Sequence, residues 1–279
     1  MPYFEFQDHQ LNYTIYGEGS RTMILTHGQL LNQRMHEPLA HDLARSGNRV
    51  ITIDLLGHGL SDRPPELWRY TFGAYAAQVV ALLDHLDIDE AVVGGTSLGA
   101  NVTLEVAVAA PERCRGLVVE MPVLDNGIVA AVQAFTPLLL MLKYGRPLVA
   151  AGALALSPIP RGPLPLLGRI VLDAIRQDHA ASPAILTGQM MGRVAPDHLT
   201  RQKIDIPSLV IGHAGDPVHP LSEAELLTSE MPRARLVEAN NILEMRLHPE
   251  RLTNEIAGFL ESCWRPRRAR SARRKKRAS

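Results

Sequence analysis

Gly95-Thr96-Ser97-Leu98-Gly99 is the stretch of sequence that decides the fold. An apolar run, Ala91-Val92-Val93-Gly94, precedes it, and a run of helical character from Ala100 to Ala110 follows it. A G-x-S-x-G pattern between a strand and a helix forms a nucleophile elbow, a strained turn that presents a serine hydroxyl above a sheet. The turn is cramped, so the positions on each side of the serine need residues almost without side chain. The alternative, from these residues alone, is an ordinary glycine-rich strand-to-helix turn.

Length and composition indicate a globular protein. A chain of 279 residues is long enough for one large α/β domain with an insertion, or for two modest domains. The composition, 46% hydrophobic and 21% charged, is ordinary for a folded domain. Cys114 and Cys263 offer neither a disulfide framework nor metal-binding spacing, which is typical of a reducing compartment. Met1 to Phe6 lacks the basic start and apolar core of a signal peptide, so we expect a soluble, cytoplasmic protein.

The net charge of zero hides an asymmetry between the body of the chain and its end. Residues 265–279 carry nine Lys/Arg and no acid, which leaves 20 basic against 29 acidic residues before them. Such a run cannot bury apolar area, so we expect 265–279 to be a disordered basic tail. It could contact anionic lipid or nucleic acid, or it could serve only for solubility. No aromatic residue interleaves the basic ones, so base stacking has no support.

Apolar periodicity predicts strands that alternate with helices. The expected strands are Tyr3–Gln7, Leu11–Tyr16, Thr22–Thr26, Arg49–Leu55, Ala91–Gly95, Arg115–Met121, Ser208–Gly212 and Arg235–Ala239, and the expected helices are Gln33–Ser46, Phe72–Leu86, the run after the elbow, Leu221–Met231 and Pro249–Trp264. Strands and helices in alternation indicate an α/β fold with a mostly parallel sheet covered on both faces.

The alternation stops between residues 123 and 203. Four apolar helical segments are expected there, interrupted by the Pro/Gly-rich hinge Ser157–Pro165. They are Ile128–Leu142, Leu148–Leu156, Leu167–Arg176 and Pro183–Gly192. Because Ile128–Leu142 is short and contains Gln133 and Pro137, we expect a buried helix rather than a membrane span. The pattern predicts a core of residues 1–122 and 204–264, with 123–203 inserted as a helical cap over an apolar pocket.

Three further motifs stand in order around the serine. Leu25-Thr26-His27-Gly28-Gln29 ends the third expected strand with an H-G pair, and the loop Asp54–Asp62 follows the next strand with the spacing D-x-x-G-x-G-x-S-D. Val210–Pro220 carries Gly212, Asp216 and Pro220 in the spacing G-x-x-x-D-x-x-x-P, close to a G-x-x-D-x-x-x-P turn with Asp216 as its acid. With these motifs and the elbow, the chain up to about Trp264 resembles the α/β-hydrolase superfamily. The chain order serine, aspartate, histidine is the one that this fold uses.

The resemblance implies roles for individual residues. Ser97 would be the nucleophile, and Asp216 would orient a catalytic histidine. The backbone N–H groups of Gln29 and Leu98 would form the oxyanion hole, where losing one donor typically costs ~10²–10³ in rate. His58, in the D-x-x-G-x-G-x-S-D loop, would organise that loop rather than act as a base. The resemblance implies no metal and no organic cofactor.

The histidine is missing from the place where the resemblance predicts it. In the family it lies about seven residues before the proline that opens the last helix, and counting back from Pro249 gives Ile242. We place the base at His248, in the same connection, where a plain surface histidine is the alternative. His219 is expected at the rim of the site and is a further candidate for the base. The other candidates for the base are His179 and His198 in the cap and Glu244 beside the empty position.

Two functions remain open from the sequence. The first is a serine hydrolase that acts on an ester, thioester or lactone of a small apolar acyl-type substrate. Serine rather than aspartate at position 97 disfavours chemistry through an alkyl–enzyme ester, as in dehalogenases and epoxide hydrolases. The second is a catalytically impaired fold that serves as a small-ligand binding or regulatory module, which Ile242 motivates.

Overall fold

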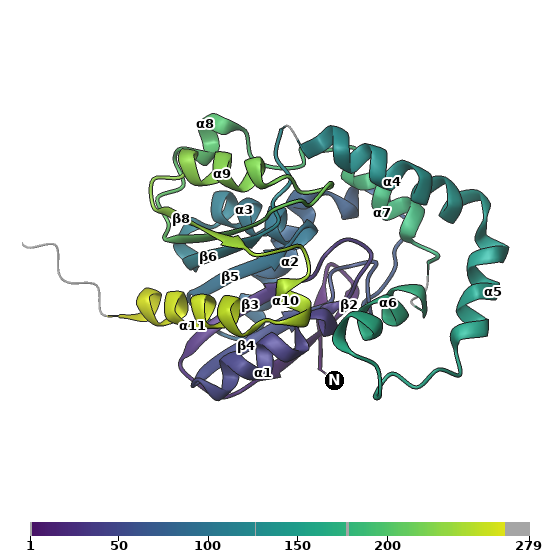
Figure 1. Cartoon of the computed structure of the whole chain (residues 1–279), viewed down its shortest axis with the longest axis horizontal. Helices are drawn as coiled ribbons and strands as arrows, with labels where there is room; N and C mark the ends of the chain where they lie inside the picture. Colours follow the sequence, from purple (N-terminus) through teal and green to yellow (C-terminus); the bar gives the residue numbers. More distant parts are fainter. Residues whose placement is uncertain (1, 126, 177–178, 266–279) are drawn as a thin grey trace, which may run out of the picture.

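The computed structural model describes residues 2–125, 127–176 and 179–265 (Figure 1). The basic tail predicted from 265 onwards therefore lies outside the described residues, apart from Arg265. The strands are β1 (Tyr3–Phe6), β2 (His9–Tyr16), β3 (Arg21–Thr26), β4 (Asn48–Ile53), β5 (Ala91–Thr96), β6 (Cys114–Glu120), β7 (Ser208–His213) and β8 (Ala234–Ala239). The helices are α1 (Glu37–Arg45), α2 (Phe72–His85), α3 (Leu98–Ala109), α4 (Gly127–Tyr144), α5 (Arg146–Leu156), α6 (Leu166–Arg176), α7 (Ser182–Gln189), α8 (His198–Arg201), α9 (Leu221–Glu230), α10 (Glu244–Leu247) and α11 (Glu250–Trp264).

The eight strands form one sheet in the order β1-β2-β4-β3-β5-β6-β7-β8. Strands β3 to β8 pair in parallel, whereas β1 and β2 form a hairpin that joins β4 antiparallel. Parallel strands need helical crossovers, and these crossovers cover the sheet on both faces. The predicted α/β-hydrolase fold, with its mostly parallel sheet flanked by helices, is confirmed.

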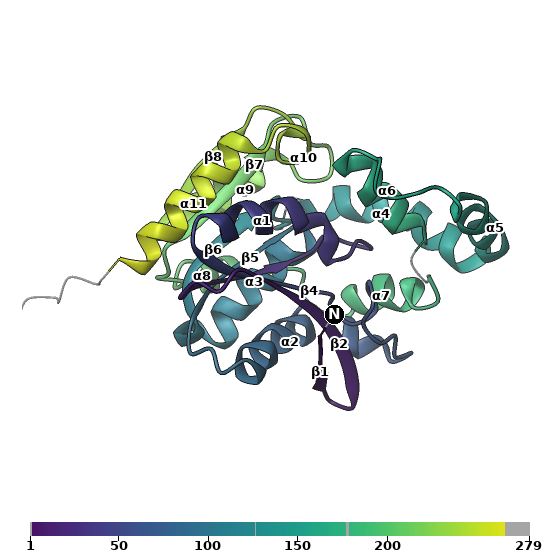
Figure 2. The ribbon, with the colours of Figure 1, turned by 90° about the horizontal axis from the view of Figure 1, so that it is seen from below.

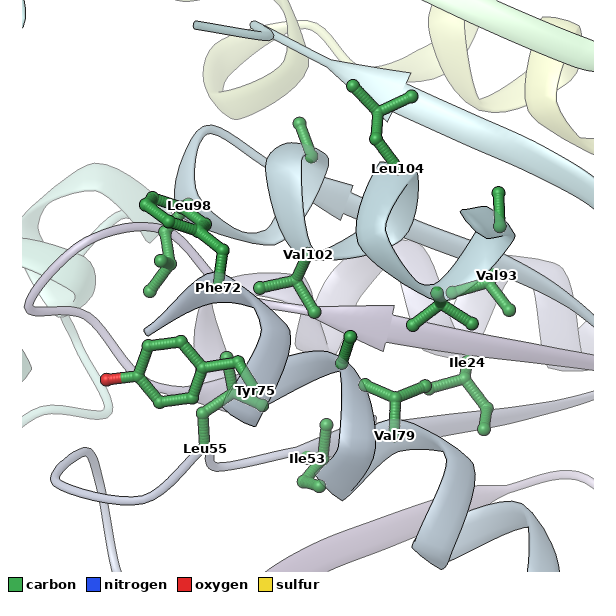
Figure 3. Packing of buried hydrophobic residues seen from close by; sticks show 14 of the residues in the cluster. Ile24, Ile53, Leu55, Phe72, Tyr75, Val79, Val93, Leu98, Val102 and Leu104 are labelled. Carbon is green, nitrogen blue, oxygen red and sulfur yellow. The ribbon is translucent and has the colours of Figure 1, made fainter. Parts of the chain in front are cut away.

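Two apolar layers fix the helices to the sheet. On one face α2, α3 and α9 pack on the strands, and Figure 3 shows side chains such as Val79 and Val102 meeting Ile24 and Val93. On the other face α1 and α11 pack against a second buried cluster that includes Leu43. Nearly every residue of β5 and α3 is buried, so the segment that carries Ser97 lies at the centre of the molecule.

In the described part of the connection from β6 to β7, the region predicted as a cap, the regular elements are all helices. Helix α4 packs on α7, and α7 packs on the 3-10 helix Leu67–Tyr70 of the core. Helix α5 lies at the edge of the molecule in both views, far from α11 (Figures 1 and 2).

One expectation about this region is wrong. Helix α4 is not buried: of its 18 residues only Gly127 and Leu142 are, although Ile128–Leu142 was expected to form a core helix. By length and composition α4 is apolar enough to cross a membrane, a test that the core helix of a soluble protein can also pass. Phe135, Leu138 and Leu139 pack partly against the core cluster, so the chain covers only part of the apolar surface of α4.

Candidate active site

The elbow around Ser97 is strained. The backbone of Ser97 has φ +56° and ψ −110°, a combination that side-chain-bearing residues rarely adopt. A Cβ atom at Gly95 would overlap the Thr26 hydroxyl and the backbone of Gly99, and one at Gly99 would overlap the Thr26 carbonyl. Both glycines of the motif are therefore required because the end of β3 passes directly against the turn. The Ser97 N–H donates to the Glu120 carbonyl, 2.9 Å away, which ties the elbow to β6.

The H-G motif at the end of β3 lies beside the elbow. The Gly99 N–H donates to the His27 carbonyl at 3.1 Å, so the two loops hold each other. His27 Nδ1 donates to the Gly28 carbonyl at 2.9 Å, and its Nε2 accepts from the Leu55 N–H at 3.2 Å. Burial lowers the pKa of His27 despite the nearby Asp54 carboxylate, so the ring is neutral and structural.

The two backbone donors predicted for the oxyanion hole line the same pocket as Ser97. Gln29 follows the H-G pair, and Leu98 is the first residue of α3. The N–H of a first helical residue has no partner within its helix, which leaves it able to bind a ligand oxygen. The Gln29 side chain accepts a hydrogen bond from Gln189 Nε2 of α7 at 2.9 Å, so this loop also contacts α7.

The loop after β4 is structural, as predicted. Asp54 accepts backbone hydrogen bonds from Gln33 at 2.7 Å and Leu60 at 2.9 Å. His58 is fully buried and hydrogen-bonds the Leu56 carbonyl through Nδ1 at 3.0 Å. Burial, together with the neighbouring His27, holds the pKa of His58 well below its usual value. His58 therefore organises the loop from inside the core.

Asp216 and His219 lie in one tight turn after β7. Asp216 Oδ1 accepts the backbone N–H groups of Val218, at 2.8 Å, and His219, at 3.0 Å. Its Oδ2 accepts a hydrogen bond from His219 Nδ1 at 3.0 Å. Burial raises the pKa of Asp216, but the hydrogen bonds from His219 outweigh this effect and leave the pKa lowered. The carboxylate is therefore ionised and fixes both the turn and the ring.

His219 bridges this carboxylate to Ser97. The distance from Ser97 Oγ to His219 Nε2 is 2.8 Å. An ionised carboxylate can only accept, so the proton lies on Nδ1 and Nε2 is left to accept the serine proton. Serine, imidazole and carboxylate thus form the continuous hydrogen-bonded chain that nucleophilic serine catalysis uses.

This geometry corrects our expectation for the base. His248, our first choice, is exposed at the end of α10, where its N–H donates to the Glu244 carbonyl at 2.9 Å. Ile242 follows β8 as predicted and is 40% exposed. The imidazole that contacts the Ser97 hydroxyl comes from another loop, the one after β7. His219, which we place at the rim of the site and prefer less than His248 as the base, is the histidine that contacts Ser97. The missed signal is the Asp-x-x-His spacing, since an aspartate that caps the next backbone N–H groups turns the third residue back towards its own carboxylate.

The remaining candidates for the base have other partners. Glu244 accepts hydrogen bonds from Arg251, at 2.7 and 2.8 Å, which lower its pKa, whereas a base there would need the pKa raised. His179 Nδ1 lies 3.1 Å from the Ser182 hydroxyl. His198 is largely exposed and faces Glu230 at 4.0 Å.

A second buried cluster that we did not predict lies behind the elbow. The carboxylate of Glu120, at the end of β6, accepts from the Thr96 hydroxyl and from Arg246 Nη2 at 3.1 Å, and it lies 3.3 Å from His213 Nε2. Burial raises the pKa of Glu120, but Arg246 first and then His213 and Thr96 more than offset it, so the pKa is lowered. This ionised group joins the ends of β5, β6 and β7 to α10.

A pocket of about 500 Å³ opens over Ser97. Its walls are mainly apolar and include Phe72 from α2, Leu124 from the connection between β6 and α4, and Phe135 and Leu186 from α4 and α7. A volume of this size suits a small organic substrate. A slightly larger pocket of about 570 Å³, near Lys203 and Arg233, lies at the amino ends of the strands and contains none of the reactive groups. Across the described ranges, no group of three or more His, Cys, Asp or Glu side chains is placed to hold a metal ion.

Comparisons with known proteins agree with this architecture. Residues 21–153 match the family described as alpha/beta hydrolase fold. Among curated proteins, the chain is similar to a haloalkane dehalogenase of Mycolicibacterium paratuberculosis, with 29% identity over 115 residues, 41% of this chain and 36% of that protein. The chain spans only about a quarter to two fifths of the length of the first curated relatives that it matches.

Solved structures resemble the chain over almost its whole length. A hydrolase from Pseudomonas aeruginosa has a TM-score of 0.76 and 23% identity, covering 93% of this chain and 97% of its own. The enol-lactonase from Burkholderia xenovorans has a TM-score of 0.73 and 21% identity, covering 93% of this chain and 100% of its own. These likenesses establish the fold.

Proposed function

Because this chain belongs to the α/β-hydrolase superfamily, we propose that it is a serine hydrolase that cleaves an ester, thioester or lactone bond of a small apolar substrate. The observation that carries the proposal is the hydrogen-bonded chain from Ser97 Oγ through His219 to Asp216, at 2.8 and 3.0 Å. A hydroxyl alone is a weak nucleophile, and an adjacent imidazole held by a carboxylate is the usual means of activating it.

The reaction follows from the positions of these groups. Ser97 Oγ attacks the carbonyl carbon while its proton passes to His219 Nε2. The negative oxygen of the tetrahedral intermediate accepts hydrogen bonds from the N–H groups of Gln29 and Leu98. His219 then returns the proton to the departing alcohol or thiol, which leaves an acyl–serine ester. Water, deprotonated by His219, releases the acid and restores Ser97.

The serine at position 97 distinguishes the proposed reaction from the reaction of some relatives. Several curated relatives are haloalkane dehalogenases. Displacement of a halide through an alkyl–enzyme ester needs a carboxylate nucleophile, whereas position 97 holds a serine. The match to those proteins covers less than half of this chain, so their substrates are not carried over.

The alternative, a binding module without catalytic activity, loses the observation that supported it. It rested on the absence of an imidazole at position 242, and His219 supplies an imidazole from the preceding loop. The pocket with its apolar walls suits either a bound acyl group or an inert ligand, so reactivity must decide between them.

Labelling with a fluorophosphonate tests the proposal directly. We expect the purified chain to be labelled and to hydrolyse p-nitrophenyl esters, with turnover highest for acyl chains that fit about 500 Å³. Ser97→Ala should lose both properties while melting at the wild-type temperature. If the folded wild-type protein is neither labelled nor active on any ester, thioester or lactone in the panel, the hydrolase proposal is wrong and the binding module becomes the better explanation.

A further inference from the structure

The tip of the cap exposes a set of large apolar side chains. Leu140, Met141 and Tyr144 lie in the last turns of α4, and Leu148 and Leu154 lie on α5; each is between 50% and 79% exposed. We name these five residues the cap-tip face. Both views place α5 at the outer edge of the molecule (Figures 1 and 2). Single exposed apolar residues are ordinary on a protein surface, but a set concentrated on two successive helices marks an interaction site.

The charges of the cap are opposite in sign to those of the core. From Met121 to Pro196 the chain has six Lys/Arg against three Asp and no Glu, whereas residues 1–120 and 197–264 have 14 basic against 26 acidic residues. Between residues 126 and 160 the only charged residues are Lys143 and Arg146, both beside the joint of α4 and α5. Lys143 Nζ lies 5.5 Å from the ring centre of Tyr144, within the face itself.

From these observations we propose that the cap-tip face docks onto an anionic lipid bilayer. An apolar helical face with basic residues at its border is the pattern that lies in the headgroup region, with the apolar side chains inserted and the cations at the surface. Anionic lipid adds an attraction for each nearby Lys or Arg. A second copy of the chain fits less well, because two net-positive caps would then meet.

Helix α4 lies on the bilayer in this arrangement and does not cross it. Ile128, Val132 and Phe135 line the pocket over Ser97, and α4 packs on α7 of the same chain. A spanning helix would leave those positions and open the pocket. Docked on the surface, α4 instead forms a pocket wall at one end and a lipid contact at the other.

If the chain is the serine hydrolase proposed above, the position of α4 also indicates which class of ester it cleaves. A substrate that enters between α4 and the core would come from the layer on which the cap lies. The expected substrates are therefore esters with an acyl chain that partitions into lipid, rather than small water-soluble esters.

Vesicle sedimentation of the full-length protein tests the docking. The cap variant is Leu148→Asp/Leu154→Asp. The control is Tyr3→Asp/Leu199→Asp, which adds the same charge at exposed residues of β1 and α8, away from the cap-tip face. The probe is vesicles of phosphatidylcholine and phosphatidylglycerol in about 0.5 M NaCl, where the Debye length is ~4 Å and purely electrostatic binding through the tail is suppressed. We expect the wild type and the control to sediment, and the cap variant to bind at least ~10-fold more weakly.

Other outcomes overturn the proposal. It fails if the wild type stays in solution, or if the cap variant sediments like the control. It also fails if light scattering shows a wild-type dimer that the cap variant dissociates, because a second copy then covers the face. Turnover of a short soluble ester, measured in parallel, should be equal in all three proteins. No fluorophosphonate labelling and no turnover of either a short or a long-chain ester, together with intact vesicle binding, would refute the hydrolase proposal and leave the docking in place.

Discussion

Replacing His219 by alanine is the sharpest test of the proposed chemistry. The change removes the imidazole that lies 2.8 Å from Ser97 Oγ and 3.0 Å from Asp216 Oδ2. Loss of the base from a serine–histidine–aspartate arrangement lowers kcat by ~10⁴–10⁶. At ~1.4 kcal/mol for each factor of ten, this is about 5–8 kcal/mol of transition-state stabilisation. The expected residual activity comes from the oxyanion donors and the pocket alone.

The fold should survive this substitution. Asp216 Oδ1 holds the turn through the backbone N–H groups of residues 218 and 219, which alanine retains. The pocket is lined by other residues, so KM for an apolar ester should change little. The assay is turnover of a p-nitrophenyl ester together with fluorophosphonate labelling, with a melting curve recorded for each variant.

His248→Ala is the matched control, because this histidine is exposed and away from the serine. A surface substitution of this kind alters energies by about 0.5 kcal/mol or less, so turnover should stay within about threefold of the wild type. Asp216→Asn should lower kcat by ~10⁴, since the amide favours the wrong imidazole tautomer. The reasoning is refuted if His219→Ala keeps more than about 1% of wild-type turnover, or if His248→Ala is the variant that loses it.

Three further substitutions, one of them with a control on α11, test the surroundings of the site. Gly99→Ala forces a Cβ into the Thr26 carbonyl and should lower the free energy of unfolding by about 2 kcal/mol, which is a fall of about 5 °C in Tm. The control is Gly258→Ala on α11, where the new Cβ meets nothing, and it should be neutral or slightly stabilising. Glu120→Gln leaves Arg246 without its buried carboxylate and should cost about 3 kcal/mol near pH 7 by denaturant unfolding. Because the pKa of Glu120 is lowered in the folded state, its stabilisation is complete above the unfolded pKa of about 4.3 and is lost as the pH falls below it, so the difference between wild type and variant should shrink in acid. Ile242→His should leave ester turnover unchanged, because His219 already hydrogen-bonds the Ser97 hydroxyl. A large gain in turnover would mean that a histidine at position 242 is the better base.

Much of the fold could be predicted from the sequence because local patterns and tertiary packing agree. The predicted strand Ala91–Gly95 and helix Phe72–Leu86 differ from β5 and α2 by a single residue at one end. A buried parallel strand reads as a continuous apolar run, and a helix that covers it shows apolar residues every three to four positions. The short helices α8 and α10 were missed, since four residues are too few to show any period.

The burial of α4 could not be predicted, and the reason is physical. An apolar sequence shows that a helix avoids water, but it does not show which surface covers the helix. Ile128–Leu142 has the composition of a core helix, yet the structure leaves most of it in contact with solvent. The apolar composition of α4, from which we predicted a buried helix, is also the reason for proposing that a lipid bilayer covers its exposed side chains.

The position of the histidine was missed for a different reason, and it bears on how the site is built. A loop after β8 can supply an imidazole only if that loop is held in register with the elbow. Here Asp216 and His219 are three residues apart in one turn, which contains Pro217, is followed by Pro220 and is closed by hydrogen bonds to the aspartate itself. The relative position of acid and base is therefore set by local geometry, and only β7 has to place the pair against Ser97. In the proposed mechanism the segment from Ile242 to His248 has no catalytic role. Its Glu244 pairs with Arg251, and its Arg246 pairs with Glu120 behind the elbow.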